Sequence, residues 1–232
     1  MRELHRKRSD IDLLLFDLDG TLVDSVPQLH LAVDAALQGC GLPGVTLEQV
    51  KQWIGNGADI LLRRAIQRCY DLQGEIDEVL VTRVRQTFDE RYLAGLDRDF
   101  TLFPGVLATL QRLRSAGYRM AVVTNKPHPF VAPLLQEAGL MPLFDQLLGG
   151  DLLPQRKPDP APLLHVCQTQ QVAPERSVMV GDSKNDVLAA KAAGMPVIGL
   201  TYGYNHGEPI AVSKPDWVMD HFCQLGDLLL AN

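Results

Sequence analysis

The feature that most constrains this chain is a short apolar run ending in two carboxylates and a glycine, Leu13-Leu14-Leu15-Phe16-Asp17-Leu18-Asp19-Gly20. An apolar run of this length predicts a strand that is buried on both faces. Asp17 and Asp19 then fall where the strand meets a loop, the end at which open α/β sheets bind ligands. Residues two apart on a strand point to the same side, so we expect both carboxylates to face one site.

Two carboxylates this close repel each other, and the pKa of one should rise unless a cation lies between them. Both Asp17 and Asp19 would suit a hard cation such as Mg²⁺, which prefers oxygen ligands. Alternatively, one could be a nucleophile and the other a general acid and base. A solvated acidic turn also explains the pair. The pair alone leaves these three interpretations open.

Length and composition restrict the class of protein. The chain has 232 residues, enough for one large or two small domains. Its hydrophobic content of 46% supports a sizeable core and argues against disorder. The net charge of -6 disfavours a nucleic-acid-binding surface. We therefore expect a folded protein that has no nucleic-acid partner.

Targeting signals and cysteine spacing bear on where the protein works. The basic cluster Arg2–Arg8 is not followed by an apolar run of signal-peptide length. No stretch approaches the roughly 18 apolar residues of a membrane span. The 4 cysteines form no CxxC pair and the 6 histidines show no ligand spacing, which predicts reduced thiols and no zinc site. We expect a cytoplasmic protein with no membrane partner.

The apolar pattern divides the chain into two kinds of structure. Between residues 27 and 99 apolar residues recur at helical spacing, which predicts three or four helices with turns near residues 41–44 and 55–57. The remainder alternates strands with helices, which predicts α/β architecture with a doubly wound parallel sheet. Beyond the first strand, we expect strands at 118–124, 144–148, 178–181, 197–200 and 217–219, and helices at 104–117, 130–138, 160–170, 185–193 and 222–230.

Three further strand ends carry residues suited to phosphate chemistry. Thr124 and Asn125, at a helix start, could form a phosphate cradle or an ordinary helix cap. Lys157 precedes a proline, which holds it extended as a point charge, although lysines in such loops are commonly exposed. Asp182 and Asp186 follow an apolar strand and could instead stabilise the dipole of the next helix.

These strand ends are more informative together than singly, because a doubly wound sheet places them along one edge. Asp17, Asp19, Asp182 and Asp186 would carry a charge of about -4 if ionised, and one divalent cation with Lys157 would return about +3. An acidic cluster of this kind needs both a metal and a lysine. Phosphoryl transfer needs the same two partners, because its transition state spreads charge over the non-bridging oxygens.

The set of motifs resembles that of the haloacid dehalogenase-like phosphatases. The resemblance rests on Asp17-Leu18-Asp19-Gly20-Thr21, Thr124, Lys157-Pro158 and Gly181-Asp182-x-x-x-Asp186, and covers nearly the whole chain. It implies a Rossmann-like core of residues 1–26 and 100–232, with a central first strand and an inserted helical cap domain of residues 27–99. It also implies Mg²⁺ as the cofactor.

The resemblance further implies a role for each motif residue. Asp17 would be the nucleophile that forms an aspartyl-phosphate, and Asp19 would protonate the leaving group and then activate water. Thr124, Asn125 and Lys157 would hold the phosphoryl group. Asp17, Asp182 and the backbone carbonyl of Asp19 would bind the metal. Asp186 would pair with Lys157 and orient the residues around the metal.

Segments outside the catalytic motifs resemble bacterial phosphoglycolate phosphatases within this superfamily. They are residues 54–58, 123–127, 149–151 and 201–205, and the resemblance implies 2-phosphoglycolate as the small phosphorylated substrate. Residues 152–155 are less polar than we expect of that loop. Gly55, Asn56 and Gly57 could offer backbone nitrogens to the substrate carboxylate. Arg63 or Arg64 could offer a cation, although arginines at such positions are commonly solvated.

Several alternatives to this function remain open at this point. They are another small phosphomonoester or pyrophosphate as substrate, a phosphosugar mutase of the same fold, a metal-free dehalogenase and a phosphorylated signalling receiver. Asp19 disfavours the dehalogenase, because departure of a halide needs no acid. A receiver would need only about half this length and no cap. The chain could be a monomer or a homodimer.

Overall fold

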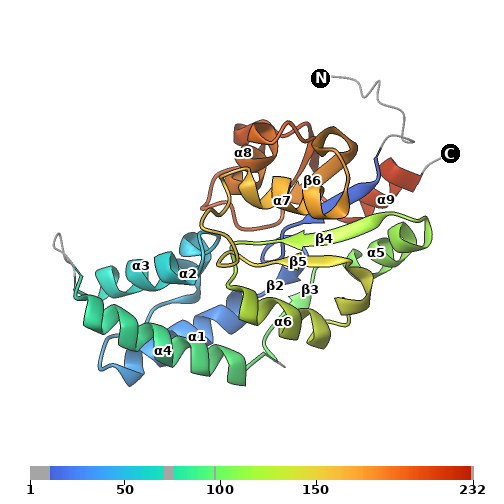
Figure 1. Cartoon of the computed structure of the whole chain (residues 1–232). Helices are drawn as coiled ribbons and strands as arrows, with labels where there is room; N and C mark the ends of the chain where they lie inside the picture. The colour runs from blue at the N-terminus through green and yellow to red at the C-terminus, as the bar shows by residue number, and fades with distance from the viewer. Residues whose placement is uncertain (1–10, 71–75, 97, 231–232) are drawn as a thin grey trace.

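The computed structural model describes residues 11–70, 76–96 and 98–230. It consists of a sheet with helices on both faces and a bundle of helices beside it (Figure 1). The basic cluster at residues 2–8 lies outside the described residues. Within the described ranges, no helix is both long and apolar enough to cross a membrane.

The main sheet has six strands in the order β5-β4-β1-β6-β7-β8. Every neighbouring pair is parallel, which confirms the predicted doubly wound sheet. β1 lies in the middle because the chain winds to one side of it through β4 and β5, and to the other through β6, β7 and β8. The strands are β1 (Leu13–Phe16), β4 (Arg119–Val123), β5 (Gln146–Leu148), β6 (Ser177–Gly181), β7 (Val197–Leu200) and β8 (Trp217–Met219).

Helices cover both faces of this sheet (Figure 1), which explains the uninterrupted apolar run of β1. Leu13 and Leu15 pack into the cluster under α7 and α8, whereas Leu14 and Phe16 pack into the cluster under α5, α6 and α9. All four side chains are fully buried. The helices are α5 (Val106–Ser115), α6 (Val131–Glu137), α7 (Ala161–Gln170), α8 (Lys184–Ala192) and α9 (Cys223–Leu230).

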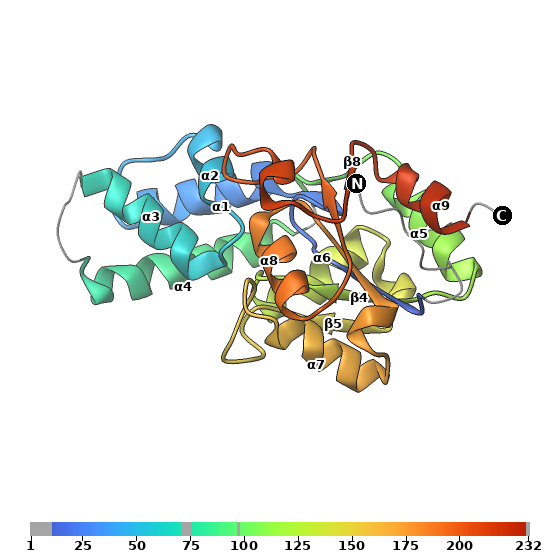
Figure 2. The ribbon, with the colours of Figure 1, turned by 90° about the horizontal axis from the view of Figure 1, so that it is seen from above.

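A bundle of four helices is inserted between β1 and β4, in agreement with the predicted three or four. It lies to one side of the sheet, as the view from above shows (Figure 2). The four helices are α1 (Val26–Gly39), α2 (Leu47–Trp53), α3 (Ala58–Tyr70) and α4 (Glu78–Ala94). We refer to them as the cap. Its division from the core at residues 27 and 99 stays a prediction, and residues 71–75 and 97 of that range lie outside the described residues.

A short antiparallel ladder joins the cap to the core. Its strands β2 (Val23–Asp24) and β3 (Thr101–Leu102) pair Val23 with Leu102 and Asp24 with Thr101. The ladder therefore holds the two connections between core and cap side by side. Two-residue strands show no periodicity, so no pattern in the sequence predicted them.

One helix begins later than predicted. We expected Pro104 in the first turn of a helix, but α5 starts at Val106. Gly105 has a φ of 82°, in the left-handed region, and this conformation cannot continue a right-handed helix. The prediction of Pro104 as a helical residue is therefore wrong.

Candidate active site

The predicted strand ends meet at one edge of the sheet. Asp17 follows β1, Thr124 follows β4 and Asp182 follows β6, and β1 lies between β4 and β6. All three residues are buried. Asp186 stands in the first turn of α8 and Lys157 in the loop before α7, and both are buried at the same edge.

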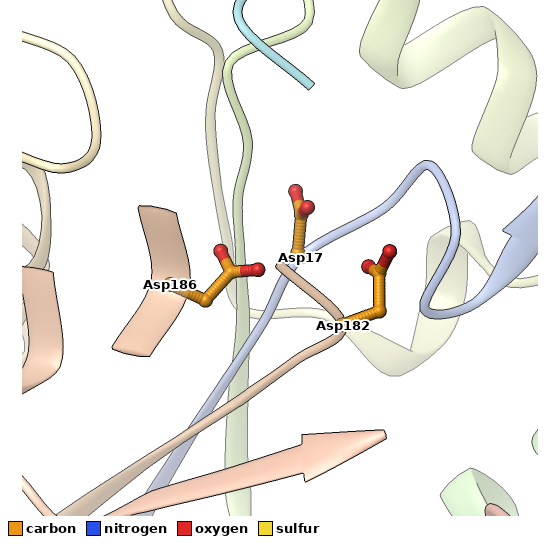
Figure 3. A group of neighbouring side chains, drawn as sticks. All are labelled: Asp17, Asp182 and Asp186. Atoms are coloured by element: carbon orange, nitrogen blue, oxygen red, sulfur yellow. The ribbon is translucent and has the colours of Figure 1, made fainter. Parts of the chain in front are cut away.

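Three carboxylates form the centre of the site. Asp17, Asp182 and Asp186 each bring a carboxylate oxygen to within 4.8 Å of the other two (Figure 3). Such a group can hold a metal ion. Asp19 does not belong to it through its side chain, and the predicted role of Asp19 as a ligand rests on its backbone carbonyl.

Hydrogen bonds hold two of these carboxylates in place. Asp182 Oδ1 accepts a bond of 2.7 Å from Thr21 Oγ1, and its Oδ2 accepts one of 2.6 Å from the backbone N–H of Tyr204. Asp186 Oδ2 accepts bonds from the backbone N–H and the hydroxyl of Ser183, in a capping box that starts α8. The motif residue Thr21 therefore helps to hold Asp182 in position, a role that we did not predict.

Lys157 neutralises part of this negative charge. Its Nζ lies 2.7 Å from Asp186 Oδ1 and 3.0 Å from Asp17 Oδ1, and it donates to the carbonyl of Val123 at 2.6 Å. Burial lowers the pKa of Lys157, but Asp17 and Asp186 raise it above its ordinary value overall. Lys157 is therefore a cation that supports both carboxylates, as predicted for its pairing with Asp186.

The carboxylate of Asp17 has fewer hydrogen bonds than those of Asp182 and Asp186. Its Oδ1 is buried and has no aligned hydrogen bond among the described residues, although Lys157 lies in ion-pair distance. Burial raises the pKa of Asp17 to about 6, against the attraction of Lys157. Burial and the neighbouring Asp17 and Asp186 also raise the pKa of Asp182. A buried carboxylate oxygen that lacks an aligned hydrogen bond and lies beside two more carboxylates fits a bound cation.

Asp19 faces the other way, toward the cap. Its carboxylate accepts bonds of 2.9 and 3.1 Å from Lys126 Nζ and a further bond from the hydroxyl of Ser25. Lys126 is buried, and we assigned it no role from the sequence. The position of Lys126 two residues after Thr124 indicates that it lies near the site, but the sequence does not show which way its side chain points.

The loop of residues 54–57 closes over the site from the cap. Asn125 Nδ2 donates to the carbonyls of Gly55 at 3.0 Å and Lys157 at 2.9 Å, so both of its side-chain donors join protein segments. Asn185 Nδ2 donates to the same Gly55 carbonyl at 3.1 Å and to Asn56 Oδ1 at 2.9 Å. A role of Asn125 in phosphate binding would therefore use its backbone and stays a prediction.

The two arginines considered from the sequence do not line the cavity between cap and core. Arg63 forms a bidentate ion pair with Glu78 at 2.7 and 2.6 Å. Arg64 donates to the carbonyl of Trp53 at 2.8 Å. Their side chains therefore serve contacts within the cap.

The cavity between cap and core is small, at ≈ 40 Å³. Gly55 and Gly57 line it, as do Asp17, Asp19 and Thr124, whereas Asn56 directs its side-chain oxygen to Asn185. Its apolar wall consists of Leu29, Ile54, Ala58, Leu61, Phe88 and Phe130. A carboxylate pair therefore meets an apolar enclosure with room for only a small group.

Comparison with known proteins agrees with this geometry. The family model of the haloacid dehalogenase-like hydrolases matches residues 11–194. The chain belongs to this family.

Relatives within the family match over nearly the whole chain. A protein of Vibrio vulnificus named phosphoglycolate phosphatase is 47% identical over 97% of this chain and 99% of its own length. A protein of Pseudomonas aeruginosa named phosphoglycolate phosphatase 1 is 51% identical over 94% of this chain and 78% of its own length. The crystal structure of a predicted phosphoglycolate phosphatase from Haemophilus somnus is 43% identical, with a TM-score of 0.90 over 94% of this chain and 98% of that one.

Proposed function

We propose that the protein is a Mg²⁺-dependent phosphomonoester hydrolase that converts 2-phosphoglycolate to glycolate and phosphate. The observation that carries the proposal is the 47% identity to the Vibrio vulnificus phosphoglycolate phosphatase over almost both full lengths. The site supports it as well, since Asp17 and Asp19 line one cavity, Lys157 lies beside Asp17, and Asp17 belongs to a group of carboxylates suited to a metal.

In the proposed reaction Asp17 is the nucleophile. One of its carboxylate oxygens forms a bond to phosphorus while the bond from phosphorus to the ester oxygen breaks, and this leaves an aspartyl-phosphate. Asp19 gives its proton to the departing glycolate oxygen. Asp19 then takes a proton from water, whose oxygen displaces Asp17 from phosphorus and releases phosphate. The two carboxylates have separate surroundings, with Lys157 beside Asp17 and Lys126 beside Asp19.

We propose Lys157 and Thr124 as the groups that hold the phosphoryl oxygens. Lys157 brings a buried positive charge next to Asp17, and Thr124 follows β4, the strand beside β1. Both would stabilise negative charge on the oxygens in the transition state. Asp186 keeps Lys157 in position through a bond of 2.7 Å.

The residues that would bind Mg²⁺ are Asp17, Asp182 and the backbone carbonyl of Asp19. The buried Asp17 Oδ1 without an aligned protein partner fits this role. When bound, the ion supplies positive charge that stabilises the phosphoryl oxygens. The cap would exclude water from the site while the ester bond breaks.

The experiment is an assay of phosphate release from 2-phosphoglycolate, β-glucose 1-phosphate, pyrophosphate and an aryl phosphate, each with Mg²⁺ and with EDTA. We expect release that strongly prefers phosphoglycolate and disappears in EDTA. Release of similar rate from all four would overturn the substrate. An absence of release from every compound would turn the proposal toward a mutase or a receiver.

Replacement of the nucleophile is the matching test at one residue. Asp17→Asn should lower kcat at least about 10⁴-fold while the circular dichroism spectrum is retained, because the amide cannot attack phosphorus. Asp227→Asn, at an exposed carboxyl of α9, is the control and should keep full activity. More than a trace of activity in Asp17→Asn would contradict the role of Asp17.

A further inference from the structure

Two polar groups in the small cavity between cap and core remain after the residues of the proposed reaction are assigned. They are the hydroxyl of Tyr92, from α4 of the cap, and the ammonium of Lys126, from the loop after β4. Both residues line the cavity and both are buried. Neither has a part in the transfer of phosphate as described above.

The hydroxyl of Tyr92 has no aligned hydrogen bond among the described residues, although the ammonium of Lys126 lies close enough to interact with it. The tyrosine is 1% exposed, and its ring is fixed by stacking on Phe88 at 5.5 Å and by an edge contact with Phe130 at 5.0 Å. A buried hydroxyl that lacks an aligned hydrogen bond is unfavourable unless a ligand supplies the missing partner. Burial raises the pKa of Tyr92 to about 12, so at neutral pH it remains a donor.

Lys126 lies beside this hydroxyl-bearing ring. Its Nζ is 4.6 Å from the centre of the Tyr92 ring, above its face. Its Nζ donates to the two oxygens of Asp19 and interacts with the Tyr92 hydroxyl, so Lys126 links the proposed acid to the cap tyrosine. Burial lowers the pKa of Lys126, but Asp19 and Tyr92 raise it overall, so the group is a cation.

The cavity around these two groups is small and lined by both charged and apolar residues. A volume of ≈ 40 Å³ corresponds to about three water molecules at roughly 10–15 Å³ each. A carboxymethyl group is of this size, and a sugar ring is larger. A cation and a hydroxyl donor on two residues that line one small, partly apolar space are groups suited to a carboxylate.

We propose that Lys126 and Tyr92 bind the carboxylate of the leaving group and so determine the preference for a short acidic phosphoester. The inference rests on the proposed function, because it assigns the residues that recognise the glycolate part of that substrate. It gives the cap a direct part in specificity through Tyr92. It also places the recognised carboxylate next to Asp19, the proposed acid for the same leaving group.

The test compares two substrates that differ only in the recognised group. 2-Phosphoglycolate carries the carboxylate, and 2-hydroxyethyl phosphate replaces it with an uncharged hydroxymethyl group. The readout is the ratio of their kcat/KM values in one preparation, so any inactive fraction cancels. We expect Tyr92→Phe to lower the ratio about tenfold and Lys126→Met to lower it further.

Matched control variants remove a tyrosine hydroxyl and a lysine ammonium outside the cavity. Tyr118→Phe removes a hydroxyl that bonds to the carbonyl of Leu229, and Lys191→Met removes an ammonium that bonds to the carbonyl of Ser213. Both should keep the ratio of the unmodified protein. Tyr92→Phe remains informative if Lys126→Met loses all turnover, because it leaves the ion pair of Lys126 with Asp19 intact.

The outcomes separate this inference from the proposed function. The unmodified protein could prefer phosphoglycolate while Tyr92→Phe lowers both kcat/KM values equally. That result would mean that the two residues only position Asp19. It would overturn the inference and leave the proposed function standing. If the unmodified protein does not distinguish the two substrates, phosphoglycolate fails as the proposed substrate and the inference fails with it.

Discussion

At the scale of single residues, the site keeps carboxylates in surroundings that oppose their charge. Asp17 is buried beside Asp182 and Asp186, with Lys157 as the adjacent cation. Burial raises the pKa of Asp17 to about 6, and that of Asp182 rises as well. Ionisation of these carboxylates therefore costs stability in the folded protein, which is common where function requires a group that folding does not favour.

This cost predicts a pH-dependent stability difference for Asp17→Asn in EDTA. A carboxyl whose pKa is raised on folding stabilises the fold below its ordinary pKa of 3.8, and this contribution is lost as the pH rises through about 6. The amide does not titrate. The variant should therefore gain free energy of unfolding relative to the unmodified protein as the pH rises from 4 to 7, up to about 3 kcal/mol.

The measurement is urea unfolding of both proteins at unit intervals of pH. Asp227→Asn serves as the control, because its carboxyl is exposed and the difference should stay constant with pH. If the difference in free energy of unfolding between Asp17→Asn and the unmodified protein were also constant with pH, the environment of Asp17 would not oppose its charge.

At the scale of elements, the short loop of residues 54–57 contributes hydrogen bonds that fasten the cap to the core. The carbonyl of Gly55 accepts from Asn125 at the end of β4 and from Asn185 in the first turn of α8. His206 bonds to the carbonyl of Gln52 in α2 at 2.8 Å, which adds a third attachment. The same loop lines the cavity, so cap position and enclosure of the substrate depend on the same contacts.

Asn185→Ala should therefore weaken substrate binding. It removes the bonds to Gly55 O and Asn56 Oδ1, at about 0.5–1.5 kcal/mol each, so we expect KM for phosphoglycolate to rise roughly tenfold. Lys184→Ala, at the exposed neighbouring position of α8, is the matched control and should leave KM unchanged. An unchanged KM in Asn185→Ala would mean that these bonds do not contribute to closure of the cap.

At the scale of the whole molecule, cap and core share one hydrophobic cluster. Val33 and Phe88 of the cap belong to the same cluster as Phe16 of β1 and Phe130 beside α6. The ladder of β2 and β3 pairs the two chain segments that connect the cap to the core. Elements that share a continuous core tend to unfold cooperatively.

We therefore expect a single calorimetric transition that Mg²⁺ shifts to higher temperature. At a concentration of about 100 times Kd, a ligand of the folded state adds about 2.7 kcal/mol. Asp182→Asn should reduce this shift, because it removes one of the proposed metal ligands. Two separate transitions would contradict cooperative unfolding, and a shift that Asp182→Asn does not reduce would contradict the assignment of Asp182.

The sequence alone determined the parts of this protein that depend on local patterns. The apolar run of β1 indicated a strand buried on both faces, and its flanking aspartates marked the ligand-binding edge. The helical spacing between residues 27 and 99 indicated the inserted bundle. These inferences worked because the period of apolar residues reflects which face of an element is buried.

The tertiary structure decided which side chains meet across long separations. It paired Lys126 with Asp19, left the hydroxyl of Tyr92 without an aligned hydrogen bond in the cavity, and bound the carboxamide of Asn125 to the cap loop. It also formed the two-residue ladder of β2 and β3. No local pattern encodes these features, because each depends on the packing of elements that are distant in the chain and on the direction that this packing gives to single side chains.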